Sequence, residues 1–220
     1  MIPSRDAFHD LLKETTAGHP ILCPEIRTLE TCSLVPLWEK VEEATGKQEE
    51  PPFWACSWPG GQALARYVLD HPDAVRGRTV LDLGCGNAIA ALGAARAGAA
   101  RVIANDVDPS ALRMAEINAQ ENGLSLEYEA RDLLADVPPV PPVEVILVGD
   151  LFYHRAMAAR VETWVRLAVR MGASALVGDP GRSYLPSQGL EALELYDVPV
   201  PHEIESTSLR RTTVFRMKTS

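Results

Sequence analysis

From residue 60 onward, short apolar runs alternate with longer stretches in which apolar residues recur every three or four positions. Apolar runs of about five residues are typical of buried strands, whereas the longer spacing is typical of amphipathic helices. Strands that alternate with helices indicate βαβ units and a parallel sheet. The pattern predicts strands over 79–83, 101–105, 124–128, 144–149 and 173–178, and helices over 62–69, 88–97, 109–121 and 155–170.

The C-terminal stretch departs from this alternation. Residues 193–200 and 212–217 both have the composition of strands, but 201–211 has too little apolar periodicity for a crossover helix. Two strands without a crossover helix favour an antiparallel pair at one end of the sheet. The fold class is therefore α/β, a Rossmann-like doubly wound sheet of seven strands with the last strand antiparallel. The proline-rich segment 137–143 predicts a stiff polyproline connection.

The first part of the chain, residues 1–59, has a less regular pattern. Phe8 and Leu11 recur at helical spacing, and 37–44 predicts a second helix. These elements are too few to form a domain core of their own. We therefore expect a helical N-terminal cap on the substrate side over 1–59, followed by the main domain over 60–220.

Composition narrows the classes of function. The 220 residues include 46% hydrophobic and 23% charged residues, as in an ordinary globular protein. The net charge of -9 disfavours binding to nucleic acid, and every apolar run is far shorter than the ~20 residues that a membrane helix needs. The four cysteines have no metal-binding spacing, and the first residues do not resemble a secretory signal. We therefore expect a cytoplasmic protein with reduced thiols that binds neither nucleic acid nor membrane.

A glycine-rich turn joins the strand predicted at 79–83 to the next helix. Gly84 and Gly86 let the backbone turn tightly and approach a ligand closely, and the helix start adds N–H donors. A simple strand-to-helix turn would have the same composition. The second signal is Asp106, which ends the next strand 24 residues after Asp82. This separation is close to the ~20 residues at which a carboxylate meets a ribose in nucleotide-binding folds.

The residue types in the turn indicate which ligand it suits. No lysine or arginine lies in 82–88, and Asp82 precedes the first glycine, so a phosphate group would be poorly bound. An acidic turn suits a cationic ligand without phosphate, such as S-adenosylmethionine, whose ammonium and sulfonium groups are positive. Asp132, after the third predicted strand, would then accept a hydrogen bond from the adenine amine. A helix N-cap is the alternative role for Asp132.

Three segments together resemble a known fold family. Residues 81–86 (Leu-Asp-Leu-Gly-Cys-Gly), 104–109 (Ala-Asn-Asp-Val-Asp-Pro) and Asp132 are similar to motif I, the acidic strand end after it and motif II of the seven-stranded S-adenosylmethionine-dependent methyltransferases. The resemblance covers 60–217 and implies a fold and a cofactor, but no substrate. Ala88 stands where this family commonly has a third glycine. On this resemblance, the cofactor-binding residues are Asp82, Gly84, Gly86, Asp106, Val107, Asp132 and Leu133.

Two further cofactor contacts are expected just before the glycine turn. Gly60 and Gly61 open the helix predicted at 62–69, so their backbone N–H groups would meet the methionine carboxylate of the cofactor. Trp58 precedes them and would form a wall of the active site. Core packing is the alternative for Trp58, and the same two roles are open to Trp54.

The reaction site is expected at the carboxyl end of the fourth predicted strand, where the chain reads Gly-Asp-Leu-Phe-Tyr at 149–153. Asp150 would hold a cationic amine and Tyr153 would enclose it by a cation–π contact, so both are predicted catalytic residues. The alternatives are an N-cap role for Asp150 and a core position for Tyr153. Arg182, after the fifth strand, would pair with an acidic protein surface or belong to a plain turn.

Residues 58–62 (Trp-Pro-Gly-Gly-Gln), 150–153 (Asp-Leu-Phe-Tyr) and 178–182 (Gly-Asp-Pro-Gly-Arg) narrow the resemblance to one family. They are similar to the lysine methyltransferases that modify the β subunit of electron transfer flavoprotein. This resemblance implies an S-adenosylmethionine-dependent protein-lysine N-methyltransferase whose partner is that subunit, and we expect a monomer. One alternative is a methyltransferase of a ribosomal protein, although that family has an asparagine where Asp150 stands. The other is a non-catalytic module that binds the cofactor or a partner.

Overall fold

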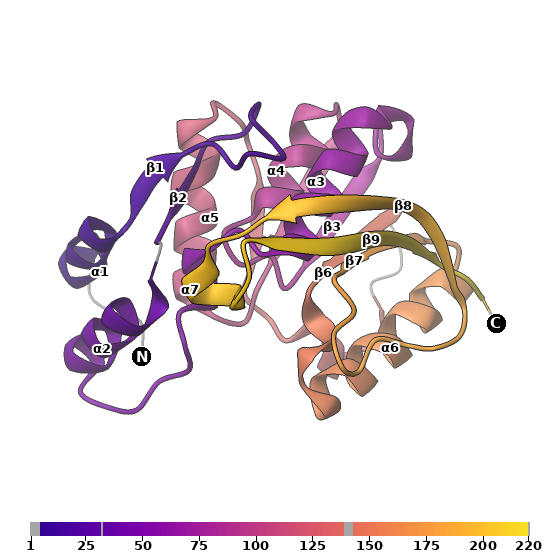
Figure 1. Ribbon diagram of the computed structural model, residues 1–220. Coiled ribbons are helices and arrows are strands. Elements are labelled where there is room, and N and C mark those ends of the chain that lie inside the picture. Colours follow the sequence, from indigo (N-terminus) through magenta and orange to yellow (C-terminus); the bar gives the residue numbers. More distant parts are fainter. Residues whose placement is uncertain (1–4, 32, 139–142, 220) are drawn as a thin grey trace.

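The computed structural model describes residues 5–31, 33–138 and 143–219. Its centre is a seven-stranded sheet in the order β5-β4-β3-β6-β7-β9-β8, of which Figure 1 labels the strands from β3 to β8. The five strands from β3 to β7 are parallel, and β9 lies antiparallel between β7 and β8. The predicted fold class is therefore confirmed. The strands are β3 Thr79–Leu83, β4 Arg101–Asn105, β5 Glu127–Glu129, β6 Val145–Gly149, β7 Ser174–Asp179, β8 Leu190–Pro199 and β9 Leu209–Met217.

Two strands differ in extent from the prediction. In place of the strand expected at 124–128, the structure has the three-residue strand β5, which begins at Glu127. The chain is not yet extended at Leu124, because the Leu124 N–H donates to the Ala119 carbonyl at the end of the preceding helix. β8 begins three residues before the predicted 193, because its antiparallel pairing with β9 continues beyond a register shift between Ala192 and Glu194. Part of the predicted polyproline connection, 139–142, and the predicted free thiol Cys32 lie outside the described residues.

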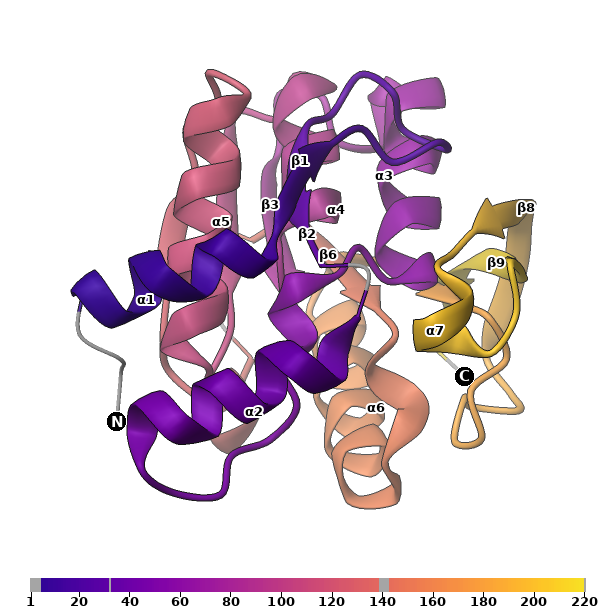
Figure 2. The ribbon, with the colours of Figure 1, turned by 60° about the vertical axis from the view of Figure 1, so that its left-hand side comes forward.

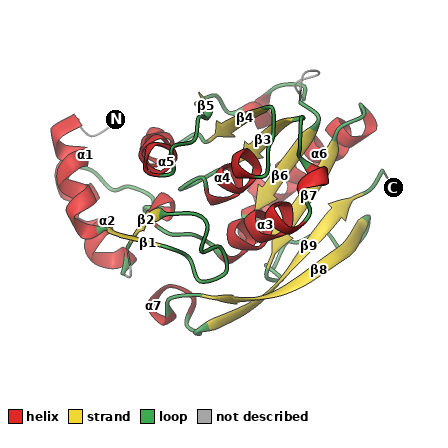
Figure 3. Cartoon of the chain, turned by 90° about the horizontal axis from the view of Figure 1, so that it is seen from above, coloured by secondary structure: helices red, strands yellow, loops and turns green. Residues whose placement is uncertain are grey.

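Helices cover both faces of the sheet, as a doubly wound fold requires (Figure 3). Along β3, Val80 packs with one helix layer and Leu81 with the other, because successive side chains of a strand point to opposite faces. The sheet therefore has a hydrophobic core on each side. One layer holds α3 Pro59–Asp70, α4 Ile89–Arg96 and α5 Pro109–Glu121, and the other holds α6 Arg155–Arg170.

Two glycines bring α3 close to the sheet. A Cβ atom on Gly60 would lie 2.2 Å from the Gly178 carbonyl oxygen, and a Cβ on Gly149 would lie 3.0 Å from the Gly61 nitrogen. Only residues without a side chain permit this approach. The first turn of α3 therefore lies directly against the carboxyl ends of β6 and β7.

The N-terminal segment packs against α5 and the loop that leads into α3 (Figure 2). Phe8, Leu37, Trp54 and Met114 form a separate buried cluster there. The Leu29 N–H also donates to Oδ1 of Asn118, which lies on α5, at 2.9 Å. The cap was predicted to be helical, but it also contains a short antiparallel strand pair. Its elements are α1 Arg5–Leu11, β1 Thr16–Gly18, β2 Thr28–Glu30 and α2 Leu34–Thr45.

A short helix, α7 His202–Glu205, connects β8 to β9. It joins antiparallel strands, so it is not a crossover helix, and none was expected here.

Within residues 5–31, 33–138 and 143–219, no helix has the length and apolar character that a membrane span requires.

Candidate active site

A cavity of about 770 Å³ opens at the carboxyl ends of β3, β4 and β6. Ligand sites in open α/β sheets lie at this edge, and the volume is within the ~300–1,000 Å³ usual for small-molecule sites. The N-terminal cap contributes one wall through residues 50–58. The cavity brings together all the predicted site residues except Asp82, Gly60 and Gly61; it is lined by Trp58, Gly84, Gly86, Asp106, Val107, Asp132, Leu133, Asp150 and Tyr153, among others.

The glycine turn forms the floor of the cavity. Gly84 and Gly86 have φ angles of 67° and 54°, in the left-handed region that glycine adopts without strain. A Cβ on Gly84 would lie 2.8 Å from the Leu151 side chain, so the turn fits closely under that residue. Ala88 is also left-handed, with φ 67°, and α4 begins only at Ile89. The chain therefore makes the turn without the third glycine.

Asp106 connects the end of β4 to the glycine turn. Its Oδ2 accepts a hydrogen bond from the Gly86 N–H and its Oδ1 from the Asp108 N–H, both at 3.0 Å. Burial raises the pKa of this carboxyl group. A carboxylate has about four lone-pair sites, so two bonds to backbone leave acceptor capacity toward the cavity.

Asp82 lies below the cavity and does not line it. Its Oδ2 accepts a hydrogen bond at 2.9 Å from the Ala91 N–H, inside the first turn of α4. Burial raises the pKa of Asp82 to about 7. The contact gives Asp82 a structural role at the start of α4, and its predicted contact with the cofactor stays a prediction.

Asp132 uses both carboxylate oxygens within the protein. Its Oδ1 accepts a hydrogen bond from the Leu134 N–H at 3.1 Å, so the N-cap alternative is confirmed for this oxygen. Its Oδ2 pairs at 2.6 Å with Arg160 of α6. Arg160 was not predicted, because an exposed arginine on an amphipathic helix gives no signal of its partner. Val107 and Leu133 also line the cavity. Val107 is largely exposed, whereas Leu133 is buried.

Asp150 is buried, and both of its carboxylate oxygens have partners within the protein, while its predicted role as the holder of a substrate ammonium stays a prediction. Its Oδ2 accepts hydrogen bonds from the Gly60 N–H at 2.5 Å and the Gly61 N–H at 3.3 Å, and its Oδ1 pairs with Arg182 at 2.8 Å. The N–H groups of Gly60 and Gly61 donate to Asp150 here, and their predicted contact with a methionine carboxylate stays a prediction. The N-cap alternative for the helix that follows Asp150 is wrong, since its side chain makes no capping bond to 151–153. Its carboxylate instead accepts from the first-turn N–H groups of α3.

The electrostatics of Asp150 follow from these partners. Burial raises the pKa of Asp150 to about 6, although the Arg182 guanidinium opposes the rise. The residue itself has φ 57°, a left-handed conformation that is uncommon for a side chain other than glycine. The hydrogen bond from the nearby Gly60 N–H holds Asp150 in this conformation. Asp150 is therefore a positioning residue that fixes the start of α3 against the sheet.

Arg182 bridges two buried acids. Besides Asp150 it pairs with Glu205 of α7 at 2.7 Å, and Glu205 in turn pairs with Arg210 at 2.8 Å. The guanidinium carbon of Arg182 also lies 5.8 Å from the centre of the Trp58 ring. The guanidinium of Arg182 thus pairs within the protein, and its predicted pairing with an acidic protein surface stays a prediction. Sequence reasoning missed Glu205, since it lies in a segment without periodicity.

Aromatic side chains form the rim of the cavity. The rings of Phe53 and Tyr153 lie 5.7 Å apart, and those of Phe53 and Trp58 lie 5.8 Å apart. Tyr153 is 48% exposed, so its core alternative is wrong. Trp58 lines the rim of the cavity. Trp54 is buried and packs against Phe8, and it also lines the cavity.

The cavity has an excess of negative charge. Six acidic side chains line it against two arginines, and both arginines are already paired with acids of the lining. Glu50, Asp106 and Asp108 are the lining acids that pair with neither arginine. The excess favours a cationic ligand and disfavours a phosphate.

The comparisons with known proteins identify the family. The family described as Ribosomal protein L11 methyltransferase (PrmA) matches residues 63–149. A solved ribosomal protein L11 methylase from Lactobacillus delbrueckii subsp. bulgaricus has the same fold, with a TM-score of 0.51 and 20% identity over 72% of this chain and 78% of that chain.

Two curated relatives match over more of the chain. The electron transfer flavoprotein beta subunit lysine methyltransferase of Rattus norvegicus is 36% identical over 74% of this chain, which spans just 66% of that relative. The protein of the same name from Xenopus laevis is 36% identical over 93% of this chain and 84% of its own length. With identity at this level across both the cap and the sheet, the chain belongs to the electron transfer flavoprotein beta subunit lysine methyltransferase family.

Proposed function

We propose that the protein transfers the methyl group of S-adenosylmethionine to a lysine side chain of the β subunit of electron transfer flavoprotein. The observation that carries this proposal is the match to the Xenopus laevis relative over 93% of the chain. A match of that extent reaches well beyond the glycine turn and the strands around it.

The cavity residues fit this cofactor. Asp106 has acceptor capacity toward the cavity for the two ribose hydroxyls, and the backbone of Gly84 and Gly86 approaches closely enough for the methionine end. Val107 and Leu133 would enclose the adenine ring. Bound there, S-adenosylmethionine supplies a methyl group on a positively charged sulfur. The negative lining suits that charge.

The acceptor lysine would enter past the aromatic rim. Tyr153, Phe53 and Trp58 form an apolar rim along which a lysine stem would lie, and their ring faces would attract its ammonium group. A lysine has an ordinary pKa near ~10.4, so it must lose a proton before it can act as a nucleophile. Burial raises the pKa of Tyr153, so its hydroxyl stays neutral and can donate or accept a hydrogen bond at the amine. Asp150 contributes by holding α3 and Arg182 in place.

Transfer of labelled methyl to purified proteins tests the proposal. The purified protein is incubated with methyl-labelled S-adenosylmethionine and either the flavoprotein β subunit or ribosomal protein L11, and the labelled lysine is located by mass spectrometry. We expect label on a lysine of the flavoprotein subunit, little on L11, and none with the Asp106→Ala variant. Label on L11 without label on the flavoprotein subunit would refute the proposal in favour of the ribosomal substrate. Absence of label on both would support the non-catalytic alternative.

The rim residue Tyr153 allows a test of the acceptor passage. Tyr153→Ala removes the ring and should raise the KM for the protein substrate at least tenfold, whereas Tyr153→Phe retains the ring and should affect mainly kcat. Affinity for S-adenosylhomocysteine, measured by calorimetry, should stay close to that of the unsubstituted protein in both. An unchanged KM in Tyr153→Ala would mean that the lysine enters elsewhere.

A further inference from the structure

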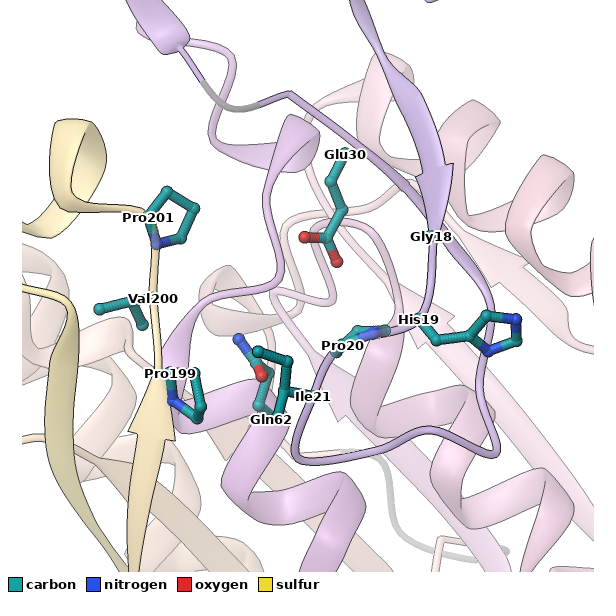
Figure 4. A pocket seen from close by; sticks show the side chains of 9 residues that line it. All are labelled: Gly18, His19, Pro20, Ile21, Glu30, Gln62, Pro199, Val200 and Pro201. Atoms are coloured by element: carbon teal, nitrogen blue, oxygen red, sulfur yellow. The ribbon is translucent and has the colours of Figure 1, made fainter.

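A second cavity, of about 320 Å³, lies between the loop that joins β1 to β2 and the end of β8 (Figure 4). It shares no lining residue with the methyl-transfer cavity. Its lining comes from three parts of the chain: Gly18, His19, Pro20, Ile21 and Glu30 from the cap, Gln62 from α3, and Pro199, Val200 and Pro201 from the end of β8.

Gln62 lines this cavity and has a buried acceptor atom without a partner. The side chain is 4% exposed, and its Nε2 donates a hydrogen bond to the Ser57 carbonyl at 2.7 Å. A carbonyl oxygen only accepts, so this contact fixes which end of the amide is nitrogen. The other end, Oε1, is buried and has no hydrogen-bond partner. A buried acceptor without a donor costs free energy, which a ligand with an N–H group would recover.

Glu30 adds a negative charge to the same cavity, and its carboxylate points toward the space beside Gln62 (Figure 4). One of its oxygens, Oε1, accepts hydrogen bonds from the hydroxyls of Thr28 and Ser57. These are neutral donors, and the residues that line the cavity include no lysine or arginine to balance the charge of Glu30. A charge-assisted bond to a cationic ligand would be stronger than a neutral one.

The walls are apolar. Pro20, Ile21, Pro199 and Val200 surround the two acceptors, and Ile21 is 77% exposed at the mouth. An occupant therefore needs several N–H donors and a positive charge at its tip, on an apolar stem. Lysine and arginine side chains have this combination.

We propose that this cavity binds an alkylammonium or alkylguanidinium group, namely a lysine or arginine side chain of the protein substrate, as a second anchor apart from the lysine that is methylated. The identity of the occupant as substrate rests on the proposed function, but the ligand chemistry does not. Ser57 connects the two cavities: its hydroxyl contacts Glu30 and accepts from Asn87 next to the glycine turn, and the following residue, Trp58, lines the first cavity. An anchored side chain would therefore lie across the 57–58 backbone from the site of methyl transfer.

Binding of a small probe tests the ligand chemistry without any methylation. Nα-acetyl-arginine methylamide is titrated into the protein saturated with S-adenosylhomocysteine, and the side-chain amide signals of Gln62 and the backbone amide signals of His19 and Ile21 are followed by NMR. We expect these signals to shift with the probe but not with the neutral Nα-acetyl-norleucine methylamide. Glu30→Gln and Gln62→Met should each weaken the probe at least tenfold, whereas Glu203→Gln, which removes an exposed charge outside the cavity, should not.

Unshifted Gln62 signals, or equal affinity in Glu30→Gln and the unsubstituted protein, would overturn the site. Melting temperature and affinity for S-adenosylhomocysteine check that the variants are folded. The second arm measures kinetics with the flavoprotein β subunit: Glu30→Gln should raise KM at least fivefold with kcat unchanged. Probe binding with an unchanged KM would overturn the assignment to the protein substrate and leave a free cation as the ligand. If the flavoprotein is not methylated at all, the proposed function fails while the NMR result still decides the cavity.

Discussion

Removing the Arg182 guanidinium should destabilise the protein strongly, because it neutralises two buried carboxylates. The side chains of Asp150 and Glu205 are 11% and 3% exposed, and Arg182 pairs with both. In Arg182→Met the stem volume is largely kept, but Asp150 is left without a cation and Glu205 retains only Arg210. Breaking a buried ion pair by removing one partner costs ~3–5 kcal/mol, so we expect a loss of this size in the free energy of unfolding near neutral pH.

The loss should depend on pH in a defined direction. Burial already raises the pKa of Asp150 to about 6 in the presence of Arg182, and without the guanidinium this pKa must rise further. A carboxyl group whose pKa is raised in the folded state binds more protons folded than unfolded, so its penalty is present above the folded pKa and disappears as the pH falls through it. Arg182→Met should therefore recover part of its stability at about pH 5.5 relative to about pH 7.5.

Urea unfolding at these two pH values measures the effect, with two comparison variants. Arg66 also pairs with two acids, Glu25 and Asp70, but both are more than 40% exposed, so Arg66→Met should cost only ~0–1 kcal/mol. Adding Asp150→Asn to Arg182→Met removes the unpaired charge and should restore ~1–3 kcal/mol. A loss in Arg182→Met no larger than in Arg66→Met at the higher pH would refute the reasoning.

Three further predictions concern other parts of the fold. Asp106→Ala removes the proposed charge-assisted bonds to the ribose, each worth ~1.5–3 kcal/mol, so calorimetry should give at least a tenfold loss of affinity for S-adenosylhomocysteine. Burial raises the pKa of Asp82 to about 7, so stability should fall as the pH rises from about 4 to about 7; melting curves of Asp82→Asn, which cannot ionise, should lack this slope. A Cβ on Gly93 would lie 2.8 Å from the Ala65 Cα, so Gly93→Ala should cost ~1–3 kcal/mol in urea unfolding, and an unchanged midpoint would contradict the contact.

Hydrophobic periodicity predicts the parallel part of the fold well, because strands and helices that are buried against a sheet have regular apolar patterns. The helix predicted over 109–121 matches α5 at both ends, since Asp108 caps it by accepting from the Ser110 N–H at 2.8 Å. The cap is predicted less well. The strands β1 and β2 have three residues each, which is too short for a period to be recognised.

In the candidate site, residue types alone do not predict which partner a carboxylate binds. The sequence correctly places Asp150 at the end of a strand beside the cavity, but the same carboxylate can bind a substrate ammonium or an arginine of the protein. Arg182 lies 32 residues further along the chain, and the two meet only because β6 and β7 are neighbours in the sheet. The N–H groups of Gly60 and Gly61 reach Asp150 because α3 packs against β6 and β7. The monomeric state and the cytoplasmic location stay predictions.

The position of β9 has a consequence for how the sheet is completed. β9 lies between β7 and β8, so these two strands, although consecutive in the chain, are not paired with each other; both pair with β9, and neither pairing can form until residues 209–217 are in place. During synthesis, the parallel part of the sheet can form while β7 still has an open edge and β8 is unpaired. Open strand edges invite pairing with other chains. The period before the final strand is in place should therefore be when this protein is most prone to aggregate, and when chaperones would have most effect on its yield.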